Sequence, residues 1–272
     1  MKQSFVKMRV VLPSNASMEH FPNNSLTSYT VQFSEEIILP PGQWEVGLLE
    51  MQFEKSWYNL QDGKIMIIET GTPPKFVTID FKVGYYPSPI DICNALNQQL
   101  KVYYGNEPMK VEFGVDDISG RVTITFRSYG INVAIDEDLG EMLGIAKGRE
   151  RTIFRNFVNY DDKRPEVYTT KVSQFPNMNP VKSIYVYSDI VQNSRVGEIE
   201  APLLRIVPVN NSKHWTTQYV EYQKIQYVPV SKNRFRQISI YLRSDTGDIV
   251  PFTTGRTIVT LGFRRVKPMV LV

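Results

Sequence analysis

Two histidines, His20 and His214, are the candidates for a Ser/His/Asp type of catalytic site. Such a site needs a histidine beside an activated nucleophile, which many hydrolases place in a G-x-S-x-G turn. His20 lies in a polar, loop-like segment, His214 precedes Trp215 at the expected edge of a strand, and no G-x-S-x-G occurs. We therefore expect structural or surface roles for both residues. Two histidines that are not brought together also make a poor transition-metal site.

The single cysteine, Cys93, excludes an intramolecular disulfide and a cysteine-based metal cluster. Its spacing places it on the apolar face of an expected helix, where a cysteine behaves as a small hydrophobic residue. A catalytic thiol needs an electropositive, accessible environment, and the second turn of this helix offers only a weak version of one. We expect Cys93 to be structural.

The N-terminal region predicts a protein made and kept in a reducing compartment. Its short apolar run is interrupted by Lys7 and Arg9, which is not typical of a signal peptide. Asn15, Asn23 and Asn210 begin N-x-S sequons, which we interpret as chance matches without a secretory signal. The sequence also contains no run of about 18 apolar residues, so we expect no membrane span.

Three groups of carboxylates could serve acid–base chemistry or calcium binding. They are Asp116 with Asp117, Asp136 to Asp138, and Asp161 with Asp162. The first group is typical of a hairpin turn, and the second is typical of a helix N-terminus stabilised by the helix dipole. The third lies in an irregular loop. Structural roles are favoured for all three, with calcium binding as the alternative.

Two basic clusters could contact nucleic acid or an acidic neighbour, because lysine and arginine neutralise phosphates. They are Lys147, Arg149, Arg151 and Arg155, and then Arg264, Arg265 and Lys267. The alternative is a solvated loop and a solvated tail. We favour the alternative, because few aromatic residues are interleaved with these short runs and the net charge is only +3. The sequence has no phosphate-binding glycine loop. We therefore predict no catalytic, cofactor-binding or metal-binding residues.

The stretch Ile38–Leu60 predicts a strand whose apolar side chains change face half-way. These side chains occupy one face up to Leu48 and the opposite face from Leu49. They are Trp44, Val46 and Leu48, followed by Leu49, Met51 and Phe53. A regular strand would turn one of these sets to water. Either a β-bulge or a strand covered on both faces would resolve the conflict.

The segment 84–148 predicts a compact α+β module of a helix, a hairpin and a short helix. Ser88 is a suitable N-cap, Pro89 suits the first helical position, and Gly105 gives a C-terminal stop. A hairpin should follow over Lys110–Val115 and Arg121–Phe126. The short helix should begin near Asp136 and carry three apolar residues inward, Leu139, Met142 and Leu143.

The remaining residues, 1–83 and 149–272, predict a β domain. Expected strands before the module are Phe5–Leu12, Ser28–Phe33, Ile65–Ile68 and Phe76–Val83, besides the one in Ile38–Leu60. Those after it are Val167–Val172, Ile184–Val191, Leu203–Val209, Tyr219–Val228, Gln237–Arg243 and Thr257–Phe263. Many short strands without βαβ alternation indicate a sandwich or jelly roll. These patterns give a mainly β fold class, a sandwich or jelly roll with the inserted α+β module. A resemblance to a known family narrows it to a single jelly-roll β-sandwich with that insertion.

Several motifs in this order resemble the penton, or minor capsid, proteins of Polinton (Maverick) elements and adintovirus-like viruses. The N-terminal motifs are LPSNASMEHFPNNSLTSYTVQF (Leu12–Phe33) and WEVGLLEMQFEKSW (Trp44–Trp57). The module motifs are VGYYPSPIDICNALNQQL (Val83–Leu100) and LGEMLGI (Leu139–Ile145). The C-terminal motifs are KSIYVYSDIVQNSRVGEIEAPLLRIVPV (Lys182–Val209) and ISIYLRSDTGDIVPF (Ile238–Phe252). Together the motifs span most of the chain.

The resemblance implies a structural capsid protein and no enzyme. Five copies would form a homopentamer at each fivefold vertex of an icosahedral shell, beside a double-jelly-roll major capsid protein. The architecture would be similar to that of the adenovirus penton base and of virophage pentons, and the location would be the virion. Binding of a fibre or a host receptor, and contact with packaged DNA, stay open. A ring of five identical wedges requires head-to-tail contacts between two different flanks of the jelly roll.

Two other classes of function remain as alternatives. One is a ligand- or receptor-binding, lectin-like β-sandwich, in which exposed aromatic residues among Trp57, Tyr58 and Trp215 form a platform. The other is an enzyme built on a jelly roll, as in the cupins. Metal-binding cupins need several histidines and a carboxylate that converge inside the barrel, and two histidines do not favour this class.

Overall fold

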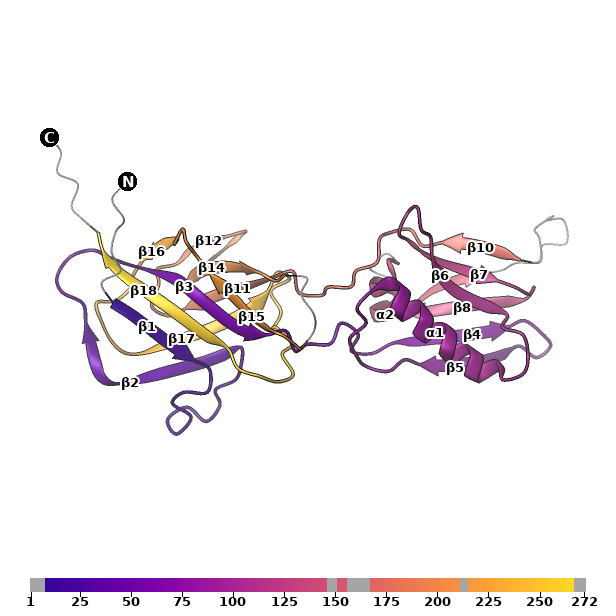
Figure 1. Ribbon diagram of the computed structural model, residues 1–272, viewed down its shortest axis with the longest axis horizontal. Helices are drawn as coiled ribbons and strands as arrows, with labels where there is room; N and C mark the ends of the chain where they lie inside the picture. The colour runs from indigo at the N-terminus through magenta and orange to yellow at the C-terminus, as the bar shows by residue number, and fades with distance from the viewer. Residues whose placement is uncertain (1–7, 146–150, 156–166, 211–214, 267–272) are drawn as a thin grey trace. The chain divides into compact units, whose positions relative to one another are not determined.

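The computed structural model describes residues 8–145, 151–155, 167–210 and 215–266 (Figure 1). Contacts within the chain divide it into two compact units. The first unit contains Met1–Trp57 and Val181–Val272, and the second unit contains Tyr58–Pro180. Each unit has a hydrophobic core of its own.

The first unit contains two main antiparallel sheets, which we call sheet A and sheet B. Sheet A has the order β1 (Met8–Pro13), β18 (Ile258–Arg265), β3 (Trp44–Glu54) and β15 (Thr217–Glu221), and β16 (Tyr227–Pro229) also pairs with β3. Sheet B has the order β14 (Leu203–Pro208), β11 (Ser183–Ser188), β17 (Arg234–Ser244) and β2 (Ser28–Ile38). A separate hairpin is formed by β12 (Ser194–Val196) and β13 (Ile199–Ala201).

The strand order of the first unit is that of a single jelly roll. We number the described strands of the first unit from 1 to 8 in chain order, leaving out the β12–β13 hairpin and counting β15 and β16 together as one strand. Sheet A then reads 1-8-3-6 and sheet B reads 5-4-7-2, so each sheet mixes strands from the two ends of the chain. Eight antiparallel strands in two sheets with such crossovers define a jelly roll. The predicted fold class is confirmed.

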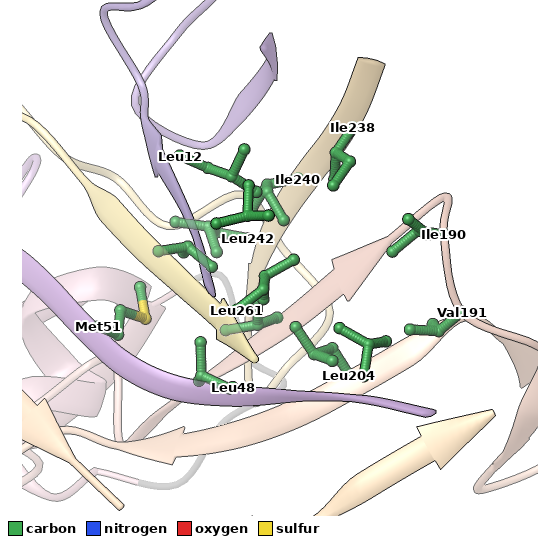
Figure 2. Close-up of a cluster of buried hydrophobic side chains, with 14 of the residues drawn as sticks. Leu12, Leu48, Met51, Ile190, Val191, Leu204, Ile238, Ile240, Leu242 and Leu261 are labelled. Carbon is green, nitrogen blue, oxygen red and sulfur yellow. The ribbon is translucent and has the colours of Figure 1, made fainter. Parts of the chain in front are cut away.

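The core of the first unit lies between the two sheets. Leu12, Leu48 and Leu261 come from three strands of sheet A, and Ile240 and Leu242 come from β17 of sheet B. Figure 2 shows these side chains in one buried cluster. Burial of such apolar surface contributes about 25 cal/mol per Å² and is the main term that holds two sheets together. Along each strand, inward apolar residues alternate with more exposed ones, as a sandwich requires.

A β-bulge at Leu49 explains the change of face that the sequence predicts in β3. Across β18, Leu261 pairs with Leu48 and Thr260 pairs with Glu50, so Leu49 is left without a partner on that strand. The carbonyl of Leu49 instead accepts a hydrogen bond from the amide of Tyr222 at 3.0 Å. The bulge is therefore confirmed.

The bulge keeps both halves of β3 on the same core. Val46 and Leu48 before it, and Met51 and Phe53 after it, are fully buried, whereas Leu49 is half-buried. Without the extra residue the second pair would face outward. Nearby glycines leave room on the outer side of the sheet. A Cβ on Gly262 would lie 2.7 Å from Leu49 Cδ2, too close for any side chain there.

The predicted strand Tyr219–Val228 is wrong as a single element. The structure divides it into β15 and β16, with residues 222–226 between them. Both strands pair with β3, β15 along Glu50–Glu54 and β16 along Glu45–Gly47. The interruption lies beside the bulge, because the strand next to a bulge loses its regular register there. Ile225 lies over Gly47, where a Cβ would come within 2.5 Å of Ile225 Cγ2.

The described residues of the second unit form two antiparallel sheets and two helices. One sheet has the order β5 (Lys75–Asp80), β4 (Lys64–Glu69), β8 (Ile131–Asp136) and β9 (Arg151–Arg155). The other has the order β10 (Tyr168–Lys171), β7 (Val122–Phe126) and β6 (Val111–Val115). The helices are α1 (Pro89–Tyr104), which packs on β6, and α2 (Glu137–Leu143). Figure 1 shows this arrangement.

Both helices begin where the sequence predicts, and α1 also ends there. In α1, the Ser88 hydroxyl accepts a hydrogen bond from the Asp91 amide at 3.3 Å, and Gly105 has a φ of 60° at the C-terminal cap. In α2, the Asp136 carboxylate accepts a hydrogen bond from the Leu139 amide at 3.1 Å. These side chains satisfy amide groups that have no partner within the helix, which fixes where each helix begins.

The boundaries of the second unit differ from those predicted for the module. The module was expected at 84–148, whereas the compact unit is Tyr58–Pro180. The strand β8 was not among the predicted strands. It pairs with β4 and so brings the β4–β5 hairpin into this unit. On the other side, β10 adds to β7. Pairing between strands that are distant in sequence decides the boundary, and local patterns carry no information on it.

We expect the first unit to fold when the second unit is excised. In a variant that joins Trp57 to Val181 through a short Gly/Ser linker, all core residues of the first unit are retained. Far-UV circular dichroism should show a β spectrum and a cooperative thermal transition. Removal of 84–148 alone is the contrasting variant, because it leaves β4 and β5 without β8 and should give an aggregating protein. The reverse result would contradict the division into units.

We expect Met51→Ala to destabilise the protein by about 2–5 kcal/mol, because it empties a fully buried site in the core. Leu49→Ala is the matched control, because it removes a side chain of similar size two residues away that is half-buried on the outer side. Leu49→Ala should lower the free energy of unfolding by less than half as much as Met51→Ala. Urea unfolding measures both. Equal costs, or a larger cost at Leu49, would place the bulge elsewhere.

Candidate interaction surfaces

The residues suited to catalysis that the structure describes lie in separate elements. His20 lies exposed in a turn, where its amide donates to the Ser17 carbonyl at 3.0 Å, and His214 lies outside the described residues. Across residues 8–145, 151–155, 167–210 and 215–266, no group of three or more His, Cys, Asp or Glu side chains is placed to hold a metal ion. Within the same residues, no helix is long and apolar enough to cross a membrane.

Cys93 lies on the buried face of α1, as predicted. It is 2% exposed, and burial raises the pKa of its thiol to about 12. Its sulfur lies 3.6 Å from the Gly114 carbonyl oxygen, to which it donates a weak hydrogen bond. A nucleophilic cysteine needs the opposite shift, towards the thiolate, and an accessible sulfur. The environment of Cys93 is that of a packing residue.

Asp116 organises the turn between β6 and β7. Its carboxylate accepts hydrogen bonds from the hydroxyl and the amide of Ser119, and forms an ion pair with Lys171 at 2.9 Å. The hydroxyl bond of Ser119 is the main cause that lowers the pKa of Asp116 to about 2, followed by Lys171. Gly120, with a φ of 65°, closes the turn. The predicted hairpin-turn role of Asp116 is confirmed.

Asp136 caps α2, as predicted, and it also accepts a hydrogen bond from the amide of Lys64 on β4. Burial raises the pKa of its carboxyl, and the hydrogen bonds from Leu139 and Lys64 oppose that effect. It therefore joins α2 to the neighbouring sheet. The third carboxylate pair, Asp161 and Asp162, lies outside the described residues.

The described part of the C-terminal basic cluster is engaged within the first unit. Arg264 forms an ion pair with Glu45 at 2.7 Å, and its guanidinium lies 3.8 Å from the centre of the Tyr227 ring. Arg265 donates to the Pro41 carbonyl at 2.6 Å. Lys267 and the cluster residues Lys147 and Arg149 lie outside the described residues, and the side chains of Arg151 and Arg155 are not described.

The aromatic platform expected for a lectin-like module is wrong for Trp57. This side chain is fully buried, with its ring stacked on Phe53 at 6.4 Å and edge-to-face with Phe252 at 5.5 Å. It belongs to the core of the first unit. Trp215 is 52% exposed, and Tyr58 lies in the second unit. Trp57 was expected at the surface because sequence alone does not say which aromatic residues a sandwich buries.

The outer side of sheet B carries a cluster of aromatic and aliphatic residues, which we call the tyrosine face. Its members alternate with the core residues of β11, β14 and β17. They are Tyr185, Tyr187, Leu203, Ile206 and Tyr241. Cross-strand pairing holds them together, because Tyr185 lies opposite Ile206, and Tyr187 lies between Leu203 and Tyr241. The rings of Tyr185 and Tyr187 stack at 6.5 Å.

Arg243 borders the tyrosine face. Arg234, Arg236 and Arg243 are exposed on β17, and β11, β14 and β17 contain no acidic residue. Arg243 lies opposite Tyr185, and its charge acts to lower the pKa of Tyr187, which burial raises. The acidic residues of sheet B, Glu35 and Glu36, lie in the part of β2 where the pairing with β17 is irregular.

The outer side of sheet A is chemically different, and we call it the carboxylate face. It carries Glu45, Glu50, Glu54 and Glu221, together with Arg9, Arg264 and Tyr219. Arg9 reaches from β1 across β18 to Glu50 on β3, at 2.6 Å. Partial desolvation raises the pKa of Tyr219, and the charges of Glu50 and Glu221 raise it further. Four carboxylates and two arginines give this face a net negative charge.

The second unit has an apolar surface of its own on the outer side of its larger sheet. Met66 on β4 pairs with Ala134 on β8, which pairs with Ile153 on β9, and Phe76 pairs with Ile68 in the next row. Phe76 is 60% exposed. The run Ile-Met-Ile-Ile in β4 is apolar on both faces, which is typical of a strand covered on both sides.

The fold of this chain is similar to that of a virophage penton protein. A crystal structure of the selenomethionine-labelled mavirus penton protein matches with a TM-score of 0.51 and 13% sequence identity, over 95% of this chain and 98% of that chain. A chain in a cryo-electron microscopy structure of the Sputnik virophage matches with a TM-score of 0.44 and 11% identity, over 95% and 97% of the two chains. No protein-family model and no curated protein sequence matches this sequence.

We expect the pKa of Asp116 to rise from about 2 towards its ordinary value in Ser119→Ala, because the main bond to the charged form is lost. Lys171→Ala should raise it by a smaller amount. Since the folded pKa lies below the unfolded one, Asp116 stabilises the hairpin above about pH 4 and loses that contribution as the pH falls towards 2. Carboxyl NMR titration measures each value. An unchanged pKa in Ser119→Ala would contradict the hydrogen-bonded turn.

Proposed function

We propose that this chain is a penton protein, a structural component of a viral capsid that forms homopentamers at the fivefold vertices of an icosahedral shell. The observation that carries the proposal is the similarity in fold to the mavirus penton protein, which extends over nearly the whole of both chains. The similarity covers the jelly roll and the second unit together. The second unit enters the chain between β3 and β11, the third and fourth positions of the jelly roll.

The chemistry of the described residues supports a structural role. Among the described candidates for catalysis, Cys93 is buried, Asp116 is occupied in a turn and Asp136 in a helix cap, and Glu50 and Glu45 of sheet A form ion pairs across strands. A five-membered ring needs two different contact surfaces on each copy. The tyrosine face and the carboxylate face supply two surfaces of different composition on opposite sheets of the same sandwich.

The proposed partners follow from the proposed place in the shell. The pentamer would sit among copies of a double-jelly-roll major capsid protein in the virion, after synthesis in a reducing intracellular compartment. The engagement of Arg264 with Glu45 and of Arg265 with Pro41 gives no support to a DNA-contacting role for these two residues. A fibre or a host receptor is a further proposed partner.

We expect the purified chain to form a pentamer. Five chains of 31.4 kDa give a mass of about 157 kDa, which size-exclusion chromatography with light scattering separates clearly from a monomer or a dimer. Negative-stain images of that peak should show fivefold rings. A symmetric dimer with one self-complementary patch would contradict the proposal. A stable monomer that binds glycans on an array would favour a ligand-binding sandwich instead.

A further inference from the structure

We propose that the tyrosine face of one copy packs against the carboxylate face of the next copy. This inference rests on the proposed homopentamer and specifies which surfaces form its contacts. It assigns the outer side of sheet B and the outer side of sheet A to opposite sides of the same interface. The bound partner is therefore a second copy of this chain.

The composition of the tyrosine face is that of a protein interface. Interfaces are enriched in tyrosine and arginine, because these side chains combine a large contact area with polar groups at the end. Here three tyrosines lie on two adjacent strands, and Arg243 lies opposite one of them, Tyr185. Tyr241, at 41% exposure, lies beside Tyr187 on the neighbouring strand. Sheet strands hold these side chains in fixed positions, so little conformational entropy is lost on binding.

Charge selects the carboxylate face as the partner. If two tyrosine faces met in a symmetric dimer, Arg243 of both copies would be brought together without a carboxylate on β11, β14 or β17. Like charges at an interface disfavour that pairing. The carboxylate face carries an excess of glutamates, and its exposed Tyr219 offers a ring for contact. Opposite charge therefore favours the contact between different faces.

The internal ion pairs prepare the carboxylate face for binding. Arg9 and Glu50 join β1 to β3 across β18, and Arg264 and Glu45 join β18 to β3. These pairs fix the positions of Glu45 and Glu50 before a partner arrives. A surface that is ordered in the free subunit loses less entropy when it forms a contact. Contacts between two different faces of identical subunits build a ring when the rotation closes.

Cysteine cross-linking tests the contact directly. Tyr241→Cys marks the tyrosine face and Tyr219→Cys marks the carboxylate face, and the native Cys93 is buried. A short bifunctional maleimide is added to pentamers assembled from one variant alone or from both variants mixed. We expect cross-linked dimers in the mixture and none with either variant alone, because each contact joins two different faces. Glu200→Cys, exposed on the β12–β13 hairpin, should give none in any mixture.

A second measurement compares two tyrosines of almost equal exposure. Tyr241→Ala should raise the concentration at which the pentamer dissociates by about 10-fold or more, as expected for a central interface tyrosine. Tyr129→Ala is the control, because Tyr129 is 43% exposed and lies in the second unit. It should leave the dissociation concentration unchanged. Light scattering across a dilution series measures both, with circular dichroism to verify that each variant is folded.

The outcomes separate this inference from the proposed function. A pentamer without cross-links in the mixture, or with equal dissociation of the Tyr241→Ala and Tyr129→Ala variants, overturns the assignment of the faces and leaves the penton function in place. Cross-linking of Tyr241→Cys with itself shows a symmetric contact and also overturns it. If the unmodified chain forms no pentamer, the proposed function fails, and this inference fails with it.

Discussion

The bulge at Leu49 is the constraint on which the first unit depends. The strand β3 pairs with β18 along one side and with β15 and β16 along the other, so every strand of sheet A except β1 is registered against it. The extra residue turns Met51 and Phe53 back to the core after Val46 and Leu48 have occupied it. It also brings Glu45, before the bulge, and Glu50, after it, to the same outer side. The bulge at Leu49 thus determines both which side chains of β3 fill the core and which glutamates of β3 lie on the carboxylate face.

Local chemistry in the sequence predicts the parts of this fold that local interactions determine. The caps of α1 and α2 follow from Ser88, Gly105 and Asp136, because each side chain or glycine acts on amides or dihedral angles within a few residues. The turn at Asp116 follows for the same reason. The strand β8 was not predicted, although its alternation Ile131, Val133 and Ile135 is present in the sequence. The pairing of β8 with β4 then decides the boundary of the second unit, and such pairing has no local signature.

The interaction surfaces are only partly predictable. The alternation in β11 places Tyr185 and Tyr187 on one side of a strand and Ile184 and Val186 on the other, and this is readable from sequence. The sequence does not tell which of these two sides faces the core, since both are apolar or aromatic. The answer depends on β14 and β17, whose residues Leu203 and Tyr241 continue the outer row across strands that are distant in the chain. Trp57 is a second case in which the sequence does not tell which side chains are buried. It was expected at the surface and lies in the core.

The similarity to the mavirus penton protein at 13% identity is what the physics of a jelly roll permits. The sandwich requires alternation of apolar residues, a bulge where a strand changes face, and turns at the right spacing, and many sequences satisfy these conditions. The core does not constrain the outer faces in this way, because polar side chains of many kinds can occupy them without changing the packing between the sheets. Three tyrosines in a cross-strand cluster on sheet B, with Arg243 beside them, are therefore not explained by the fold. An aromatic, cationic face on one sheet and an anionic face on the other favour contact between unlike faces, and this asymmetry gives an assembly of identical copies a direction.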